Sequence, residues 1–161
     1  MKVVKQHDAR RLFLGAAWVF IAYNVLGALV GWLAALPESN GERGDVHNVG
    51  SNALYGKGTA LSPPLWLLAV WALFVLAATR HGWLGRLGVL LTFLVAGFYA
   101  SAGQLGEIKK HSSPLTGAKW DVVLVLGSIG IAIALVVMLA WVYMVVLEIV
   151  GRVRAHRLRP T

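Results

Sequence analysis

The stretch VVLVLGSIGIAIALVVMLAWVYMVVL, residues 122–147, contains no charged side chain. An uncharged apolar run of about 18 or more residues is typical of a helix that crosses a lipid bilayer. The hydrocarbon interior offers no water to backbone N–H and C=O groups, so a spanning segment bonds these groups within a helix. This stretch therefore predicts an integral membrane protein.

The composition supports a membrane class for the whole chain of 161 residues. Hydrophobic residues make up 58 % of it, against about 45–50 % in soluble domains. Cysteine is absent, which excludes disulfides, iron–sulfur ligation and thiol nucleophiles. The formal net charge is +8, but the lysines and arginines flank the apolar segments, as membrane topology alone requires. We therefore expect no nucleic-acid partner, no cofactor and no bound metal.

Three further apolar segments complete an expected bundle of four spanning helices. Ser62-Pro63-Pro64 is expected to open the second, because serine can cap a helix and proline fits its first turn. Glycines in residues 80–86 are expected to form a tight connection to the third. The predicted spans are residues 12–36, 63–79, 84–105 and 122–150, with loops 37–62 and 106–121 and a basic tail, 151–161. The predicted fold class is an all-α integral membrane protein with a single membrane domain, residues 1–161, folded as a four-transmembrane-helix up-down bundle.

The positions of lysine and arginine predict the orientation of the bundle. Four lie before the first span, two in the 80–86 turn and four in the tail, and the two long loops hold the other five. Cytoplasmic segments are enriched in these residues, so both termini are expected in the cytoplasm. The expected location is a plasma membrane of the bacterial inner-membrane type. The apolar run 12–36 is too long for the core of a signal peptide, so we expect it to be retained.

Four polar side chains in or near the spans are candidates for a ligand or interhelical contact. Asn24 lies near the middle of the first span, where an unpaired amide in hydrocarbon is costly. Tyr23 is its neighbour, and Tyr99 and Gln104 lie on the third span. Such groups either form hydrogen bonds between helices or line a path for a ligand, and the sequence leaves both interpretations open.

Gly27 and Gly31 are four residues apart on the first span. Small residues at this spacing form a groove on one helix face, into which another backbone can pack. No acidic or basic residue lies deep in any predicted span. Proton-coupled carriers usually have such a residue at mid-membrane, so a self-contained pump is not expected.

A candidate cluster on the outer face comes from the two long loops. Glu107 and His111 have helical i, i+4 spacing, and Asp45 and His47 add two more potential ligands. Together they have the chemistry of a zinc-type site. However, His111 directly precedes Ser112-Ser113-Pro114, which interrupts helical geometry, and two lysines adjoin it. Solvated rim residues are therefore the preferred interpretation.

The tail carries Arg152, Arg154, Arg157 and Arg159 among apolar residues. Each cation near anionic lipid contributes about 1 kcal/mol, so we expect contact with lipid headgroups. Docking to an acidic surface of a cytosolic protein is the alternative. Glu148 and Arg152 are spaced i, i+4 and are expected to pair on one helical face.

No catalytic residues are predicted, because the chain lacks a recognised nucleophile motif and a complete phosphate-binding loop. The preferred function is a non-catalytic accessory or assembly subunit of a membrane complex, formed with other membrane proteins or by self-association. A transporter or channel for a neutral or lipid-like solute is the first alternative, with Asn24, Tyr99 and Gln104 as lining residues. A membrane enzyme with an extracytoplasmic His/carboxylate site is the second.

Overall fold

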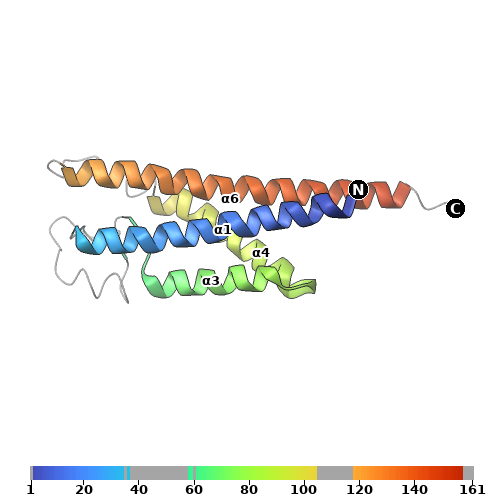
Figure 1. Cartoon of the computed structure of the whole chain (residues 1–161), viewed down its shortest axis with the longest axis horizontal. Coiled ribbons are helices and arrows are strands. Elements are labelled where there is room, and N and C mark those ends of the chain that lie inside the picture. Colours follow the sequence, from blue (N-terminus) through green and yellow to red (C-terminus); the bar gives the residue numbers. More distant parts are fainter. Residues whose placement is uncertain (1, 35, 37–57, 60, 105–117, 158–161) are drawn as a thin grey trace.

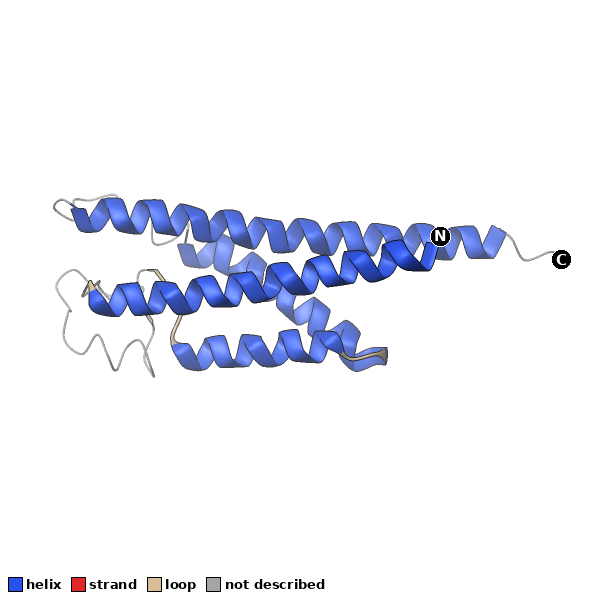
Figure 2. Cartoon of the chain, viewed as in Figure 1, coloured by secondary structure: helices blue, strands red, loops and turns tan. Residues whose placement is uncertain are grey.

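The computed structural model describes residues 2–34, 36, 58, 59, 61–104 and 118–157, which are helical apart from short connecting pieces (Figure 2). Its elements are α1 (Lys2–Leu33), α3 (Leu65–Thr79), α4 (Gly82–Phe98), the π-helix η1 (Tyr99–Gln104) and α6 (Ala118–Arg157). These described ranges contain no β-strand. The predicted all-α class is therefore confirmed.

Three helical stretches are long and apolar enough to cross a membrane. They are His7–Leu33, Gly82–Ser101 and Val123–Val153, with mean hydropathies of 1.9, 1.6 and 2.8. Helix α3 is also apolar but has only 15 residues. At about 1.5 Å per residue it is about 22 Å long, against a hydrocarbon core of about 30 Å. The three long helices indicate a membrane protein.

The helices run back and forth along one long axis (Figure 1). α1 packs against α6 and α3, and α4 packs against α3 and α6. α4 crosses obliquely from the end of α3 towards α6 (Figure 1). The start of α1, the α3–α4 turn and the end of α6 lie towards one end of the molecule, which we call the hairpin end. Residues 58, 59 and 61–64, which we call the pre-α3 segment, lie towards the other.

A two-residue turn, Arg80 and His81, joins α3 to α4. Gly82 starts α4 with a φ of +77°, in a left-handed region that glycine enters without steric cost. Further along α4, a Cβ on Gly88 would lie 2.3 Å from the backbone nitrogen of Ala78. The two helices therefore touch through their backbones, and their connection is shorter than the sequence predicted.

An aromatic cluster of Phe20, Trp71 and Tyr99 joins α1, α3 and η1 in the core. The rings of Phe20 and Trp71 stack with centroids 5.4 Å apart, and Tyr99 meets Phe20 edge-on at 5.0 Å. Such aromatic pairs each contribute about 0.5–1.5 kcal/mol beyond their buried area. Many leucine, valine and isoleucine side chains are instead exposed on the outer faces of the helices, where lipid tails would contact them.

The pre-α3 segment forms a tight turn against α1. The backbone groups of Thr59 and Ser62 bond reciprocally, with N···O distances of 2.8 and 3.2 Å. The prediction that Ser62 caps the next helix is wrong, because the N-cap of α3 is Pro64, without a side-chain cap bond. Since Ser62 lies two residues ahead of that cap, its hydroxyl is used in a tertiary contact, donating to the Asn24 carbonyl of α1 at 2.7 Å.

Helices α1 and α6 continue beyond the predicted spans. α1 begins at Lys2 rather than near residue 12, because residues 2–11 include good helix formers such as lysine, arginine and alanine. α6 runs from Ala118 to Arg157, so the predicted tail starts as helix. Its end projects past the α3–α4 turn (Figure 1). The third predicted span consists of α4 followed by η1.

Candidate functional site

Polar side chains from α1, η1 and the pre-α3 segment meet near one another, and we call them the polar layer: Tyr23, Asn24, Ser62 and Tyr99. The Tyr23 hydroxyl donates a hydrogen bond to the carbonyl of Leu126 on α6. Gly130 of α6 makes room for the layer, since a Cβ there would lie 3.0 Å from both the Tyr23 ring and the Tyr99 hydroxyl. Three of the four polar residues selected from the sequence therefore gather in one place.

Asn24 is completely buried between α1 and the pre-α3 segment. Its Nδ2 donates to the Phe20 carbonyl one turn earlier, at 2.8 Å. Its Oδ1 is buried and has no hydrogen-bond partner among the described residues. A buried acceptor without a partner costs about 1–3 kcal/mol. The amide therefore does not form a side-chain bond across the described helices, whereas the Asn24 backbone carbonyl does, to Ser62.

Tyr99 is placed by a change of helix type. It is the first residue of η1, and the two consecutive side chains Tyr99 and Ala100 are both buried. A regular α-helix turns successive residues by about 100°, and the wider π-turn helps to direct both inward. The Tyr99 hydroxyl donates to the Leu61 carbonyl of the pre-α3 segment at 3.3 Å. This bond joins the third helical stretch to the residues that lead into α3.

Other polar residues of the third stretch do not join this layer within the described structure. The hydroxyls of Thr92 and Ser101 donate to carbonyls of their own helix, those of Gly88 and Gly97, each at 2.8 Å. Hydroxyls in helices often bond one turn back in this way. Gln104 is the last residue of η1, and its side chain lies outside the described residues.

Gly27 and Gly31 of α1 face the pre-α3 segment. A Cβ on Gly27 would lie 3.2 Å from the Leu61 carbonyl oxygen, and one on Gly31 would lie 2.4 Å from Oγ1 of Thr59. The backbone of a turn approaches Gly27, and the side chain of Thr59 from the same turn approaches Gly31, so the neighbour of both glycines is a turn rather than a helix. Because Gly27 and Gly31 have no side chain, the turn can pack closely against α1.

The outer-face candidates Asp45, His47, Glu107 and His111 all lie outside the described residues. Among the residues that are described, no three His, Cys, Asp or Glu side chains come together to hold a metal ion. The proposed contacts of this cluster therefore stay predictions.

The arginines of the predicted tail divide into described and undescribed positions. Arg152 forms an ion pair with Glu148 on the exposed surface of α6, which confirms the predicted i, i+4 pairing. Arg154 and Arg157 lie on the last turns of α6, but their side chains are outside the described part, as is all of Arg159. Their contact with lipid headgroups stays a prediction.

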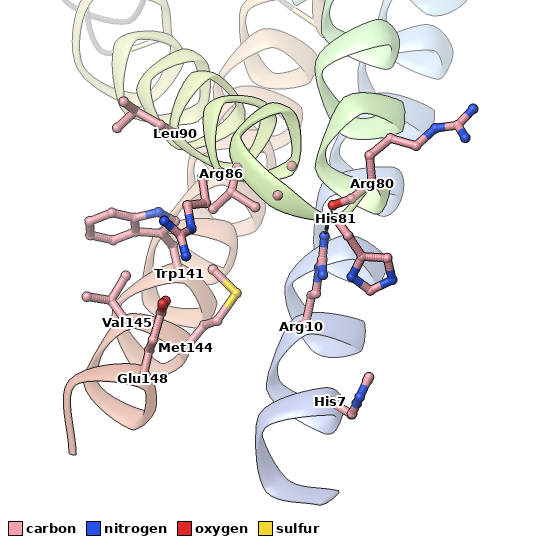
Figure 3. A pocket seen from close by; sticks show the side chains of 13 residues that line it. His7, Arg10, Arg80, His81, Arg86, Leu90, Trp141, Met144, Val145 and Glu148 are labelled. Atoms are coloured by element: carbon pink, nitrogen blue, oxygen red, sulfur yellow. Dashed lines mark hydrogen bonds between the residues drawn. The ribbon is translucent and has the colours of Figure 1, made fainter. Parts of the chain in front are cut away.

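A cleft of about 480 Å³ opens at the hairpin end between α1, the α3–α4 turn and α6 (Figure 3). We call it the basic cleft, and its charged and histidine side chains are His7, Arg10, Arg80, His81, Arg86 and Glu148. Among the described lining residues, Arg10 and Arg86 bring cationic side chains to the cleft, whereas the guanidinium of Arg80 extends away from it (Figure 3). The one carboxylate of this described lining, that of Glu148, is paired with Arg152. The electrostatics of the cleft favour an anion.

The arginines of the basic cleft have different roles. Arg10 is anchored, because its Nη2 donates to the Ala78 carbonyl at 2.6 Å and also to the Arg80 carbonyl. These carbonyls end α3, where a cation is favourable to both the free acceptors and the helix dipole. Arg86 is exposed, makes no hydrogen bond or ion pair with any described residue, and points from α4 into the cleft (Figure 3).

The other walls of the basic cleft are apolar. Val89 and Leu90 come from α4, and Trp141, Met144 and Val145 come from α6. The Trp141 ring stacks on Phe93 with centroids 4.1 Å apart, which fixes the wall between α4 and α6. The cleft is therefore amphipathic, because it combines the cations Arg10 and Arg86 with hydrocarbon and indole surface.

Sequence reasoning did not identify the basic cleft as a site. Arg10, Arg80 and Arg86 entered only the count of positive charges that oriented the bundle. That count already assigned the first residues, the 80–86 turn and the end of the last helix to one side of the membrane. This shared side was the available signal, but proximity within it depends on how the helices pack.

A second hollow, of about 720 Å³, lies along α1 and α6, and we call it the α1–α6 groove. Its lining residues are Asp8, Arg11, Leu12, Gly15, Ala16, Val19, Ile133 and Val136. A Cβ on Gly15 would meet no atom within 4 Å. The groove is thus shallow enough at Gly15 for a larger side chain or another helix to approach.

Known proteins provide no template for these sites. No family model matches the chain, and neither a curated protein nor a solved structure matches it. Function is therefore inferred from the chain's own contacts and charges.

Proposed function

We propose that this protein is a non-catalytic accessory or assembly subunit of a membrane complex. In this proposal α1, α3, α4 with η1, and α6 cross a plasma membrane of the bacterial inner-membrane type as an up-down bundle. The excess of lysine and arginine supports a cytoplasmic hairpin end, with both termini on that side. The short helix α3 crosses together with the pre-α3 segment that leads into it.

The observation that carries this proposal is the bonding of the polar layer. The hydroxyls of Tyr23, Ser62 and Tyr99 each donate to a backbone carbonyl of a different element. These bonds connect α1, α6, η1 and the pre-α3 segment. Groups that hold elements together are not free to line a path for a solute, so the bonding favours a structural role over a pore through the middle of the bundle.

The α1–α6 groove is the surface on which we expect a partner to pack. Gly15 and Ala16 permit close backbone approach, and the other walls are mainly aliphatic. Asp8 and Arg11 lie at the hairpin end of the groove and carry opposite charges. The matching occupant is an apolar transmembrane helix of another membrane protein, with charged residues of both signs at its cytoplasmic end.

The experiment compares Gly15→Leu with the control Gly151→Leu. Both glycines are exposed on helices, and a Cβ at either would meet no atom within 4 Å, so both variants are expected to fold. Tagged proteins are purified from the native host in mild detergent, and copurifying membrane proteins are identified by mass spectrometry. Gly15→Leu is expected to lose a partner that the wild-type protein and Gly151→Leu retain.

Two other results would decide against the hetero-complex. Recovery of the wild-type protein only as an isolated monomer would contradict an accessory role. Recovery of the wild-type protein only with copies of itself would make the partner a second copy of this chain, and Gly15→Leu should then reduce the oligomer to a monomer.

The basic cleft favours a second candidate function, the handling of a lipid-like solute. It combines cations with an apolar wall, as a phospholipid requires. The test measures transfer of a fluorescent phospholipid between leaflets of liposomes that contain the purified protein. A path through the bundle predicts that Asn24→Leu changes the rate, and an unchanged rate would remove Asn24 from that path.

A further inference from the structure

We propose that the basic cleft binds the phosphate headgroup of an anionic phospholipid from the cytoplasmic leaflet. This site is separate from the α1–α6 groove and from the arginines at the end of α6. It shares with the proposed accessory role only the assignment of the hairpin end to the cytoplasm, and it deepens the second candidate function by naming the phosphate headgroup as the group that the cleft binds. The cleft volume of about 480 Å³ falls within the range of about 300–1,000 Å³ that is usual for small-molecule sites.

The donors for a phosphate come from α1 and α4. Both hydrogen bonds of Arg10 to described residues use Nη2, so its Nη1 and Nε have no partner in the part of the chain that the structure describes. Arg86 has no bond to a described residue, and its guanidinium points into the cleft (Figure 3). Guanidinium groups bind phosphate oxygens through two parallel N–H bonds, which gives geometric selectivity as well as attraction. The guanidinium of Arg80 extends away from the cleft (Figure 3), so Arg10 and Arg86 are the two arginines that would bind the phosphate.

The competing carboxylate is already neutralised. Glu148 is the one acidic side chain among the described residues that line the cleft, and its carboxylate accepts from Arg152 one turn along α6. A bound phosphate therefore meets a net positive environment without direct repulsion from a free carboxylate. The ion pair also holds Glu148 on the α6 side, away from Arg10.

The apolar wall selects an amphiphile over a free anion. The side of the cleft between α4 and α6 is lined by Leu90, Trp141 and Val145. An inorganic phosphate has no apolar group that could pack against these side chains. Leu90 is itself 45 % exposed, so the apolar wall continues to the outer surface of α4. The phosphate would sit among the arginines while the glycerol and first methylenes lie along this wall.

An exposed tryptophan gives the depth of the cleft in the membrane. Trp83, in the first turn of α4 beside the cleft, is 74 % exposed. Exposed tryptophans gather at the membrane–water interface, the level at which lipid phosphates lie. The cleft is therefore at the height of the headgroups rather than in the hydrocarbon or the cytosol.

The experiment measures lipid retention by native mass spectrometry of the full-length protein in detergent. Phosphatidylglycerol is compared with phosphatidylcholine, and Arg86→Gln is compared with Arg11→Gln. Arg11 is an exposed arginine of α1 that lines the α1–α6 groove, so its loss makes the same charge change outside the cleft. Arg86→Gln is expected to weaken phosphatidylglycerol binding about fivefold. Arg11→Gln is expected to leave it unchanged.

Three outcomes would overturn this proposal. Equal loss in the two variants would mean a diffuse surface charge rather than a site. Equal retention of the two lipids by the wild-type protein would mean no headgroup recognition. Displacement of the lipid by millimolar inorganic phosphate would mean that the cleft takes the free anion. None of these results would affect partner copurification, so the accessory role is tested separately.

Discussion

The two ends of the bundle use polar side chains in opposite ways. In the polar layer, the hydroxyls of Tyr23, Ser62 and Tyr99 donate to backbone carbonyls of neighbouring elements, and only the buried Oδ1 of Asn24 lacks a partner among the described residues. In the basic cleft, Arg86 has no bonding partner among the described residues and faces an open cavity. Polar groups that are satisfied internally hold a fold together, whereas unsatisfied cations are available to a ligand. From this difference we expect the polar layer to stabilise the fold and the basic cleft to bind a ligand.

The largest expected loss of stability comes from a substitution at Gly58, in the pre-α3 segment that bonds to the polar layer. This residue has a φ of +88°, and a Cβ on it would lie 2.4 Å from the Ser62 carbonyl oxygen. Gly58→Val is expected to lower the free energy of unfolding by about 2–5 kcal/mol, through left-handed backbone strain and overpacking. Thermal unfolding in detergent, followed by circular dichroism, checks this. Gly151→Val, with open space around the added side chain, is the control and should unfold near the wild-type temperature.

The next largest effect tests whether Arg10, which lines the basic cleft, also stabilises the fold at the hairpin end. Arg10→Gln removes charge-assisted bonds to the last carbonyls of α3. With an allowance for partial exposure, the free energy of unfolding should fall by about 1–2 kcal/mol. Arg11→Gln removes the same charge without such bonds and should unfold like the wild-type protein. Equal stabilities of the two variants would mean that Arg10 does not anchor the α3–α4 turn.

A smaller effect sharpens the account of the polar layer. Tyr23→Phe and Tyr99→Phe each remove one hydroxyl bond to a carbonyl and leave the ring contacts in place. Hydrogen bonds between membrane helices average about 0.6 kcal/mol, so each variant should lose about that much stability. Tyr143→Phe, at a side chain that is 49 % exposed, should lose none. An unfolding titration with a denaturing detergent measures the stability of all three variants. Equal stabilities would mean that the two hydroxyl bonds do not stabilise the fold.

The smallest effect concerns the ion pair beside the basic cleft. Glu148→Gln removes the exposed pair with Arg152, and the expected loss of stability is about 0.2–0.5 kcal/mol at low salt. The difference should disappear at about 1 M salt, because exposed charges are then screened. Lipid retention should rise in the same variant, since Arg152 beside the cleft then carries a positive charge that Glu148 no longer neutralises. A fall in phosphatidylglycerol retention would contradict the anion-binding account of this end.

Much of the fold was predictable because its signals are local. The 122–147 stretch becomes the middle of α6, and the chain is all-α with three helices of membrane length. Helical spacing also predicted the Glu148–Arg152 pair, which needs only one turn of helix. The role of Ser62 was wrong, because a neighbouring helix offered its hydroxyl an acceptor that a local capping rule does not consider.

The candidate sites were predictable only in part. Tyr23, Asn24 and Tyr99 stand out in the sequence as polar residues in apolar surroundings. Their positions relative to one another depend on the π-turn at Tyr99 and on Gly130 of α6, neither of which has a clear sequence signal. The basic cleft depends on the oblique path of α4, which no hydropathy pattern describes (Figure 1).

The sequence by itself determined that this protein is helical and has helices suited to a bilayer. Uncharged runs of that length leave the backbone no alternative in hydrocarbon but to bond within a helix. The tertiary structure alone decided which carbonyls accept from Tyr23 and Tyr99 and that Arg10 and Arg86 border one cleft with Glu148. Those contacts join residues far apart in the chain, and close packing between glycine-lined faces, rather than local hydropathy, sets their distances.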